Sequence, residues 1–200
     1  FRFPEPVGDQ EVINIEHEEV LMFPRYFADK GLKRVTFKFG VDRDMRRVLK
    51  ILEALGLTST EMVNVKGVEV SPRDVVAVCS PNPAKLGDRM SGQLSAGLWI
   101  KGLKDKKERS VYIYQLVDNL ECMNKYGSQA VVAQTAVGPV IMMELMTKGI
   151  WDGKGVLGPE NFPPEPFMER LPTYGFPSKM MELESEYKKA KDEKAFKKGF

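Results

Sequence analysis

Before residue 128, apolar residues recur at every second position in several runs, a period that is typical of β-strands. This alternation predicts strands at 11–16, 32–39, 62–70, 93–103 and 109–117. The third run is expected to bend at Gly67. The charged stretch 104–108 separates the last two runs and predicts the tip of a β-hairpin.

Two helices are predicted among these strands by their start signals. Asp42 is a good N-cap residue, and apolar residues follow it at helical spacing as far as Gly56, namely Met45, Val48, Leu49, Leu52 and Leu55. The Ser-Pro-Arg-Asp run at 71–74 combines a capping serine, a first-turn proline and an early acid. It predicts a short helix that ends near Cys79.

From residue 128 onward the period changes from two to about 3.6. The pattern predicts a long apolar helix, a proline-rich loop, a short helix and a final helix, at 130–146, 149–166, 167–171 and 178–198. The final helix is acidic at its start and basic at its end, with Lys194, Lys197 and Lys198 expected on a solvated face. Strands first and helices last predict an α+β fold, with domains at 1–127 and 128–200.

Composition limits the classes of partner. The chain has 200 residues, of which 42% are apolar and 29% charged, and its net charge is only +2. That balance predicts no general attraction to nucleic acid or to an anionic membrane. The apolar helix is interrupted by Gln134, Pro139 and Glu144, so we expect a buried core helix and not a membrane span.

The cysteines and the lone histidine limit the chemistry. Cys79 and Cys122 are too few for a disulfide framework or a four-ligand zinc site, so we expect two reduced, buried thiols in a cytoplasmic protein. One histidine, His17, excludes a His-rich metal site, and we expect no metal. The chain opens at Phe1 without a methionine or a signal segment, which indicates a fragment or a processed product.

One stretch matches a nucleotide-binding pattern by its letters alone. Residues 153–158 read Gly-Lys-Gly-Val-Leu-Gly, but a predicted helix precedes them and Pro159 follows them. A dinucleotide fingerprint needs a strand before it and a helix N-terminus after it. We therefore predict a loop there, and no cofactor-binding residue in this chain.

Two side chains are candidates for substrate contact. His17 precedes Glu18 and Glu19, and it fits either a general base or a structural hydrogen-bonding residue. Lys38 lies near a predicted strand end before Gly40, where its ammonium could bind a substrate carboxylate or could simply face water. No residue pattern identifies a catalytic acid or base.

Six short motifs, taken in order, resemble the C-terminal half of the saccharopine dehydrogenase family. This group includes glutamate-forming saccharopine reductases and carboxynorspermidine dehydrogenases. The matching stretches are Phe-Arg-Phe-Pro-Glu-Pro-Val-Gly at 1–8, His-Glu-Glu at 17–19 with Phe-Pro-Arg at 23–25, Val-Thr-Phe-Lys-Phe-Gly at 35–40, the run 65–74, Thr-Ala-Val-Gly-Pro at 135–139, and Gly-Val-Leu-Gly-Pro-Glu at 155–160.

The resemblance implies a fold and an activity. Its members have an N-terminal Rossmann domain that binds NADP or NAD. Their second domain is α+β around a mixed, largely antiparallel sheet, resembles the C-terminal domain of glyceraldehyde-3-phosphate dehydrogenases, binds substrate and forms a homodimer. This chain would begin inside that second domain. The implied reaction is reversible reduction of an imine to a secondary amine in an amino-acid conjugate of lysine or polyamine metabolism.

The resemblance also implies binding residues. Lys38 falls where saccharopine reductases carry a carboxylate-binding arginine, and it keeps the charge but lacks the bidentate fork. Thr135 falls at a helix start where a threonine hydroxyl can reach a substrate carboxylate. His17 and Glu19 match a His-Pro-Glu pattern of unassigned role. The substrate stays open among saccharopine, carboxynorspermidine and homospermidine types, and the alternative function is a stand-alone ligand-binding or dimerisation module.

Overall fold

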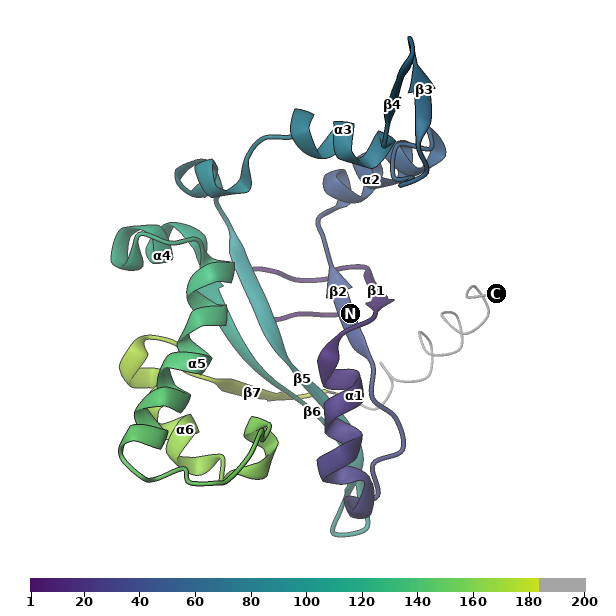
Figure 1. Cartoon of the computed structure of the whole chain (residues 1–200). Coiled ribbons are helices and arrows are strands. Elements are labelled where there is room, and N and C mark those ends of the chain that lie inside the picture. The colour runs from purple at the N-terminus through teal and green to yellow at the C-terminus, as the bar shows by residue number, and fades with distance from the viewer. Residues whose placement is uncertain (184–200) are drawn as a thin grey trace. The chain divides into compact units, whose positions relative to one another are not determined.

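The computed structural model describes residues 1–183 and divides into two compact units, Phe1–Ser91 and Gly92–Phe200 (Figure 1). Both units combine helices with small sheets, which confirms the predicted α+β class. Every strand pairing in the described residues is antiparallel, so the predicted parallel component of the sheet is not seen there. The loop at 127–129 lies inside the second unit, and the proposed domains 1–127 and 128–200 stay a prediction.

The first unit begins with a short two-stranded ribbon. Strand β1 (Val12–Ile15) pairs with strand β2 (Phe37–Gly40), so the predicted second strand is shorter than its apolar pattern. Helix α1 (Glu18–Phe27) and a single 3₁₀ turn, η1 (Ala28–Lys30), connect them. The sequence pattern did not predict α1, whose first turn carries two acids that suit the positive end of a helix dipole.

Helix α2 (Arg43–Ala54) begins where it was predicted. The Asp42 carboxylate accepts hydrogen bonds from the backbone N–H groups of Asp44 and Met45, at 2.9 and 3.0 Å. Two of the four N–H groups that a helix start leaves without a partner are thereby satisfied. The apolar residues of α2 remain largely exposed, because the buried apolar side chains of the described chain all lie in the second unit.

The run at 62–70 forms two strands instead of one bent strand. Strands β3 (Val63–Val65) and β4 (Val68–Val70) pair as a hairpin whose turn residues, Lys66 and Gly67, have φ of +53° and +87°. Glycine suits the second position because left-handed backbone costs it nothing.

Helix α3 (Pro72–Cys79) follows the hairpin at its predicted place, but two details of the prediction were wrong. The Ser71 hydroxyl is buried and makes no capping hydrogen bond. Cys79 is exposed at the helix end, where a short helix on the surface gives it nothing to pack into, whereas Cys122 is buried as expected. Two 3₁₀ turns, η2 (Pro83–Lys85) and η3 (Gly87–Arg89), lead to the second unit.

The second unit is built on a three-stranded antiparallel sheet of order β5-β6-β7. Strands β5 (Gln93–Lys104) and β6 (Lys107–Asp118) form the predicted long hairpin, with Asp105 and Lys106 at its tip. Strand β7 (Lys179–Glu182) pairs with β6. The final helix predicted at 178–198 is therefore wrong over β7, and its remainder with the terminal lysines lies outside the described residues.

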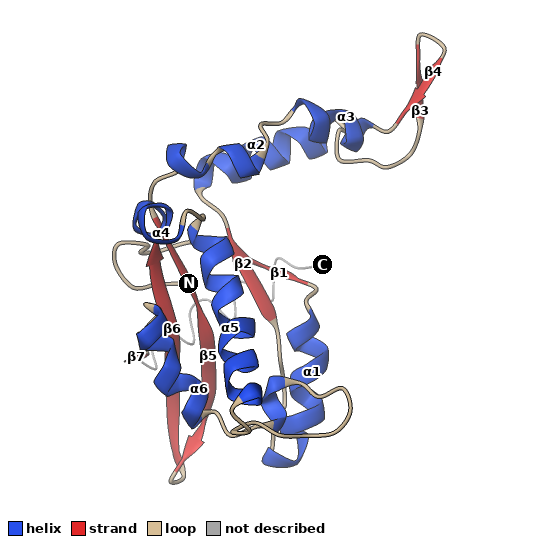
Figure 2. Ribbon diagram, turned by 60° about the vertical axis from the view of Figure 1, so that its left-hand side comes forward, coloured by secondary structure: helices blue, strands red, loops and turns tan. Residues whose placement is uncertain are grey.

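Helices cover one face of that sheet, as Figure 2 shows for α5 beside β5 and β6. They are α4 (Asn119–Tyr126), α5 (Ala130–Thr147) and α6 (Glu165–Arg170). One 3₁₀ turn, η4 (Pro159–Asn161), precedes α6 and another, η5 (Leu171–Tyr174), follows it. The Gln134 side chain of α5 donates to Gln115 of β6 at 2.9 Å, which marks the covered face. Odd-numbered residues of β6 face α5, so its even-numbered residues line the opposite face.

The core of the second unit lies under α5. Ile141 and Leu145 are completely buried and pack in one cluster with Val137, Trp151 and Phe176. Helix α5 is long and apolar enough to cross a membrane by length and composition alone, a test that core helices also pass. One side of α5 forms the core of the unit, but only 28% of the helix is buried, so it is not the fully buried helix that the sequence predicted.

Candidate functional site

Lys38 lies on one face of the β1–β2 ribbon, opposite Asn14. The two residues are register partners, and the Lys38 ammonium donates a hydrogen bond to Asn14 Oδ1 at 3.0 Å. Both side chains are exposed in the described structure. The pair places a positive charge at the predicted position, close to the end of β2, where a carboxylate could approach it.

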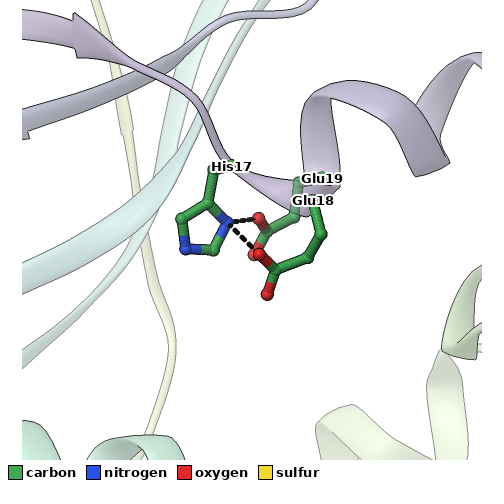
Figure 3. Close-up of side chains that lie close together, drawn as sticks. All are labelled: His17, Glu18 and Glu19. Atoms are coloured by element: carbon green, nitrogen blue, oxygen red, sulfur yellow. Dashed lines mark hydrogen bonds and ion pairs between the residues drawn. The ribbon is translucent and has the colours of Figure 1, made fainter.

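His17 precedes the first residue of α1, in extended backbone. Its ring stacks on Phe37 with centroids 3.9 Å apart and planes 6° from parallel. Nδ1 faces both following carboxylates, with Glu18 at 3.2 Å and Glu19 closer still (Figure 3). Since a carboxylate only accepts hydrogen bonds, Nδ1 carries the proton in this arrangement.

The ribbon separates His17 from Lys38. Phe37 and Lys38 are successive strand residues, so their side chains leave opposite faces of the ribbon. His17 stacks on the Phe37 side, whereas Lys38 contacts Asn14 on the other. The two predicted substrate residues are thus neighbours in the fold, but they do not converge on one face.

The His17 cluster also has the donor types of a metal site. One imidazole and two carboxylates, from Glu18 and Glu19, bring ligand atoms within 4.8 Å of one another. Such donors suit zinc and related ions. In the structure both carboxylates face Nδ1, whose single N–H can donate to only one of them at a time. The sequence pattern excluded only a site with several histidines, so a cluster of one histidine and two carboxylates was missed. That the protein binds no metal stays a prediction.

Thr135 belongs to the second unit, and it does not lie at a helix start as predicted. Helix α5 starts at Ala130, so Thr135 lies in its second turn and not at the helix start. Its hydroxyl donates to the carbonyl of Val131, one turn earlier, at 2.7 Å. The hydroxyl proton is therefore used within the helix, and towards another group this side chain can only accept a hydrogen bond.

The sheet face opposite α5 is lined with aromatic side chains. Trp99 Nε1 donates to the Ser110 hydroxyl at 2.9 Å, and the Tyr112 hydroxyl lies 3.2 Å from that of Ser95. The Tyr112 and Tyr114 rings stack with centroids 5.2 Å apart. Burial raises the pKa of Tyr112, so its hydroxyl stays protonated. Ser110 and Tyr112 are each only 3% exposed, so this part of the face is already buried within the chain.

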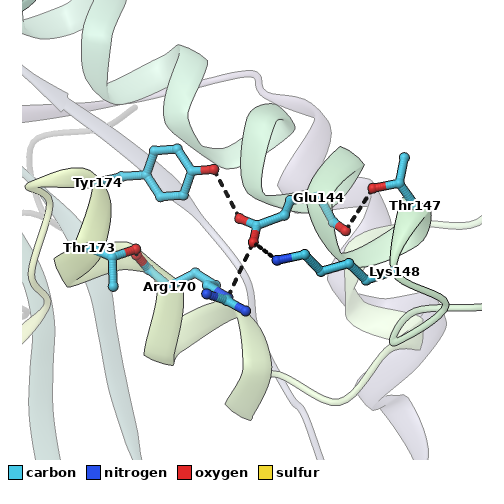
Figure 4. A network of polar contacts seen from close by, with 6 residues as sticks. All are labelled: Glu144, Thr147, Lys148, Arg170, Thr173 and Tyr174. Atoms are coloured by element: carbon cyan, nitrogen blue, oxygen red, sulfur yellow. Dashed lines mark hydrogen bonds and ion pairs between the residues drawn. The ribbon is translucent and has the colours of Figure 1, made fainter.

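A polar network ties α5 to the segment after α6. The Glu144 carboxylate accepts hydrogen bonds from the Lys148 ammonium and the Tyr174 hydroxyl, and Arg170 approaches it to 3.6 Å (Figure 4). The hydrogen bond from Lys148 and then that from Tyr174 hold the pKa of Glu144 below its usual value. The same carboxylate raises the pKa of Tyr174. The sequence offered one signal of this network, the Glu144/Lys148 spacing on one helix face.

The glycine-rich loop at 153–158 packs against apolar side chains. It follows helix α5 and precedes only a single 3₁₀ turn, so it lacks the strand and helix of a dinucleotide fingerprint. The loop borders a cavity of about 120 Å³ whose walls include Met142, Trp151 and Phe162. A Cβ on Gly153 would lie 2.6 Å from the Leu157 side chain. That contact is to the end of a flexible side chain, which can move aside, so the steric demand for glycine here is small.

Comparisons with known proteins agree on one family. Residues 1–176 match the family model described as the saccharopine dehydrogenase C-terminal domain. A carboxyaminopropylagmatine dehydrogenase of Synechocystis is 32% identical over 171 residues, which are 86% of this chain and 42% of that protein. A carboxynorspermidine synthase of Vibrio alginolyticus is 30% identical over 185 residues, 92% of this chain and 44% of that protein, and the Vibrio cholerae protein of the same name is 29% identical over the same length. The chain spans less than half the length of these relatives.

Proposed function

Because this chain belongs to the saccharopine dehydrogenase family, we propose that it forms the substrate-binding and dimer-forming part of an oxidoreductase that reversibly reduces an imine to a secondary amine. The match of the family model over residues 1–176 is the observation that carries this proposal. The names of the three relatives favour a carboxylated polyamine conjugate over saccharopine as the substrate class. We place the protein in polyamine metabolism, in the cytoplasm.

Lys38 is the proposed anchor for the substrate carboxylate. Its ammonium is exposed, lies near the end of β2 and presents several N–H donors on one atom. A carboxylate held there fixes one end of the substrate, and orientation of the reacting carbon is the main contribution that a substrate domain makes to such a reaction.

His17 and Thr135 are proposed as separate substrate-contact residues, because His17 lies on the other face of the ribbon from Lys38 and Thr135 belongs to the second unit. His17 is held in one orientation by its stack on Phe37 and by the neighbouring carboxylates. Glu18 and Glu19 add negative charge that would attract a polyamine ammonium. In the second unit taken by itself, the Thr135 hydroxyl would accept a hydrogen bond from a substrate N–H, because its own proton is donated to the Val131 carbonyl.

The nicotinamide cofactor, NADP or NAD, is proposed to bind mainly to residues outside this chain. The only letter match to a dinucleotide fingerprint, at 153–158, has the wrong flanking elements. This part of the enzyme would therefore supply substrate binding, orientation and contact with a second copy. We propose that the homodimer forms through the long β5–β6 hairpin, whose Leu98 and Ile100 side chains are 44% and 43% exposed.

The experiment is turnover by the full-length protein, with NADP and NAD, on carboxynorspermidine, carboxyaminopropylagmatine and saccharopine. Activity on one of the two polyamine conjugates is expected. Turnover of saccharopine alone would contradict the substrate class, and no turnover of any candidate with either cofactor would refute the enzyme and favour a ligand-binding or dimerisation module.

Variants of Lys38 test the anchor. Lys38→Met keeps the aliphatic stem and removes the charge, and is expected to raise KM about 10- to 100-fold, the equivalent of a charge-assisted hydrogen bond. Lys38→Arg should retain most activity, because a guanidinium binds carboxylate at least as well. The control is Lys50→Met, an exposed lysine on α2. Equal KM values for the wild type and Lys38→Met would remove Lys38 from the site.

A further inference from the structure

We propose that Asn14 is a second carboxylate-binding residue, and that Asn14 and Lys38 together form a two-point clamp for the carboxylate of the substrate. The inference rests on the proposed function, in which Lys38 is the anchor. The new element is Asn14, which neither the sequence motifs nor the comparisons point to. It faces Lys38 directly across the β1–β2 ribbon, with the two side chains in hydrogen-bond contact at 3.0 Å.

The orientation of the Asn14 amide follows from the chemistry of its partner. A lysine ammonium has three donors and no acceptor, so the amide oxygen must face Lys38. The amide nitrogen, with its two N–H donors, then points away from the ammonium on the same planar group. Within residues 1–183, no hydrogen bond from this nitrogen to another protein group is found. Asn14 therefore has donor capacity beside a fixed positive charge.

Two donor groups match the shape of a carboxylate better than one. The two oxygens of a carboxylate favour parallel N–H donors, which an arginine supplies in a single rigid fork. Lysine supplies a point charge with no fixed second direction. An asparagine beside it adds a second, planar donor group, so the pair would bind one carboxylate oxygen at the ammonium and the other at the amide.

The ribbon holds the two side chains of the clamp opposite each other. The two residues come from different strands whose register is fixed by pairing from Val12–Gly40 to Ile15–Phe37. On the same face as Lys38, the Val12 side chain fills the space beside Gly40, since it lies 3.2 Å from where a Cβ on Gly40 would be. The bulky stack of His17 on Phe37 lies on the opposite face. Asn14 and Lys38 are themselves exposed, so a carboxylate can reach the pair from the solvent side.

The test compares three variants of the full-length enzyme on its best substrate. Asn14→Ala removes the amide donors and is expected to raise KM about tenfold with little change in kcat. Asn14→Asp keeps the size but pairs Lys38 with a permanent carboxylate and repels the substrate's own, so KM should rise more than in Asn14→Ala. The melting temperature of Asn14→Asp should stay equal or rise, because the cross-strand contact becomes an ion pair.

Asn64→Ala is the matched control. Asn64 of β3 also makes an exposed cross-strand contact with a charged residue, Glu69, at 2.7 Å and in the same unit. A merely structural Asn14 predicts that both alanine variants behave alike and that Asn14→Asp binds substrate normally. The clamp predicts that KM rises in the Asn14 variants and not in Asn64→Ala. It also predicts that the melting temperature of Asn14→Asp is unchanged or higher.

The outcomes separate the clamp from the proposed function. If the enzyme is active and KM rises in Lys38→Met but not in Asn14→Ala, the clamp is overturned and the proposed function is unaffected. If the full-length protein turns over no candidate, the proposed function fails. The clamp is then tested by calorimetric titration with carboxynorspermidine and with the same triamine lacking its carboxyl group. Binding that needs the carboxyl group and weakens in Asn14→Ala supports the clamp, whereas carboxyl-independent binding or no binding overturns it.

Discussion

Gly97 in β5 allows the closest approach of two strands in the second unit. It pairs with Tyr114 of β6, and a Cβ at this position would lie 2.2 Å from the Ile113 carbonyl oxygen and 2.8 Å from Tyr114 Cα. These are backbone atoms, so they cannot rotate out of the way. In a Gly97→Ala variant the two strands must therefore move apart at the middle of the hairpin.

The cost can be worked out from three contributions. Forcing a methyl group into a packed position costs about 1–3 kcal/mol. A weakened ladder hydrogen bond beside it adds about 1 kcal/mol. Replacing a flexible glycine by alanine within a strand returns roughly 0.5–1 kcal/mol. The sum predicts that Gly97→Ala lowers the free energy of unfolding by about 2 kcal/mol.

Urea unfolding of the chain, followed by tryptophan fluorescence, measures this change. Both tryptophans, Trp99 and Trp151, lie in the second unit, so the signal reports on the sheet and its core. With a slope of about 2 kcal/mol per molar urea, the midpoint should fall by about 1 M. The control is Gly102→Ala in the same strand, where a Cβ meets nothing within 4 Å and stability should stay equal or rise. Equal midpoints for the two variants would refute the steric explanation.

Three further predictions concern charge, cofactor and assembly. The pKa of Glu144 is lowered in the folded chain, so its stabilising contribution is present above its ordinary pKa of 4.5 and is lost as pH falls through the folded value. Glu144→Gln should therefore flatten the acid limb of a plot of stability against pH, and an unchanged limb would contradict the network. Calorimetric titration of the isolated chain with NADPH should give no measurable heat of binding. Micromolar affinity would contradict the proposal that the cofactor binds mainly to residues outside this chain. Light scattering at high micromolar concentration should show self-association, and a uniform monomer would remove the support for a dimer through the sheet.

Much of the fold was predictable wherever a local signal decides the outcome. Asp42 caps its helix through contacts two and three residues away, and such contacts can be foreseen from sequence spacing. The hairpin tip at 104–108 is set by two alternating runs and the charged residues between them. These elements need little help from distant parts of the chain, which is why their pattern was sufficient.

Elements that depend on distant partners were missed. Residues 179–182, Lys-Met-Met-Glu, have a high intrinsic preference for helix, yet they form β7. The strand is fixed by pairing with the central strand β6 and by hydrogen bonds from Arg109 to Glu182, which is 73 residues away. Tertiary pairing outweighs propensity here, and no local window contains that information.

The candidate site shows the same division between local and distant information. Alternation alone placed Lys38 on a strand face, and a charged residue near a strand end was enough to suggest carboxylate binding. Asn14 carried no such signal, because its role depends on a register that joins it to a residue 24 positions later. Thr135 shows the converse: a residue matched by its motif has its hydroxyl proton committed to its own helix. This hydrogen bond changes the role that can be proposed for Thr135, from donating to a carboxylate to accepting from an N–H group, and no sequence motif shows that direction.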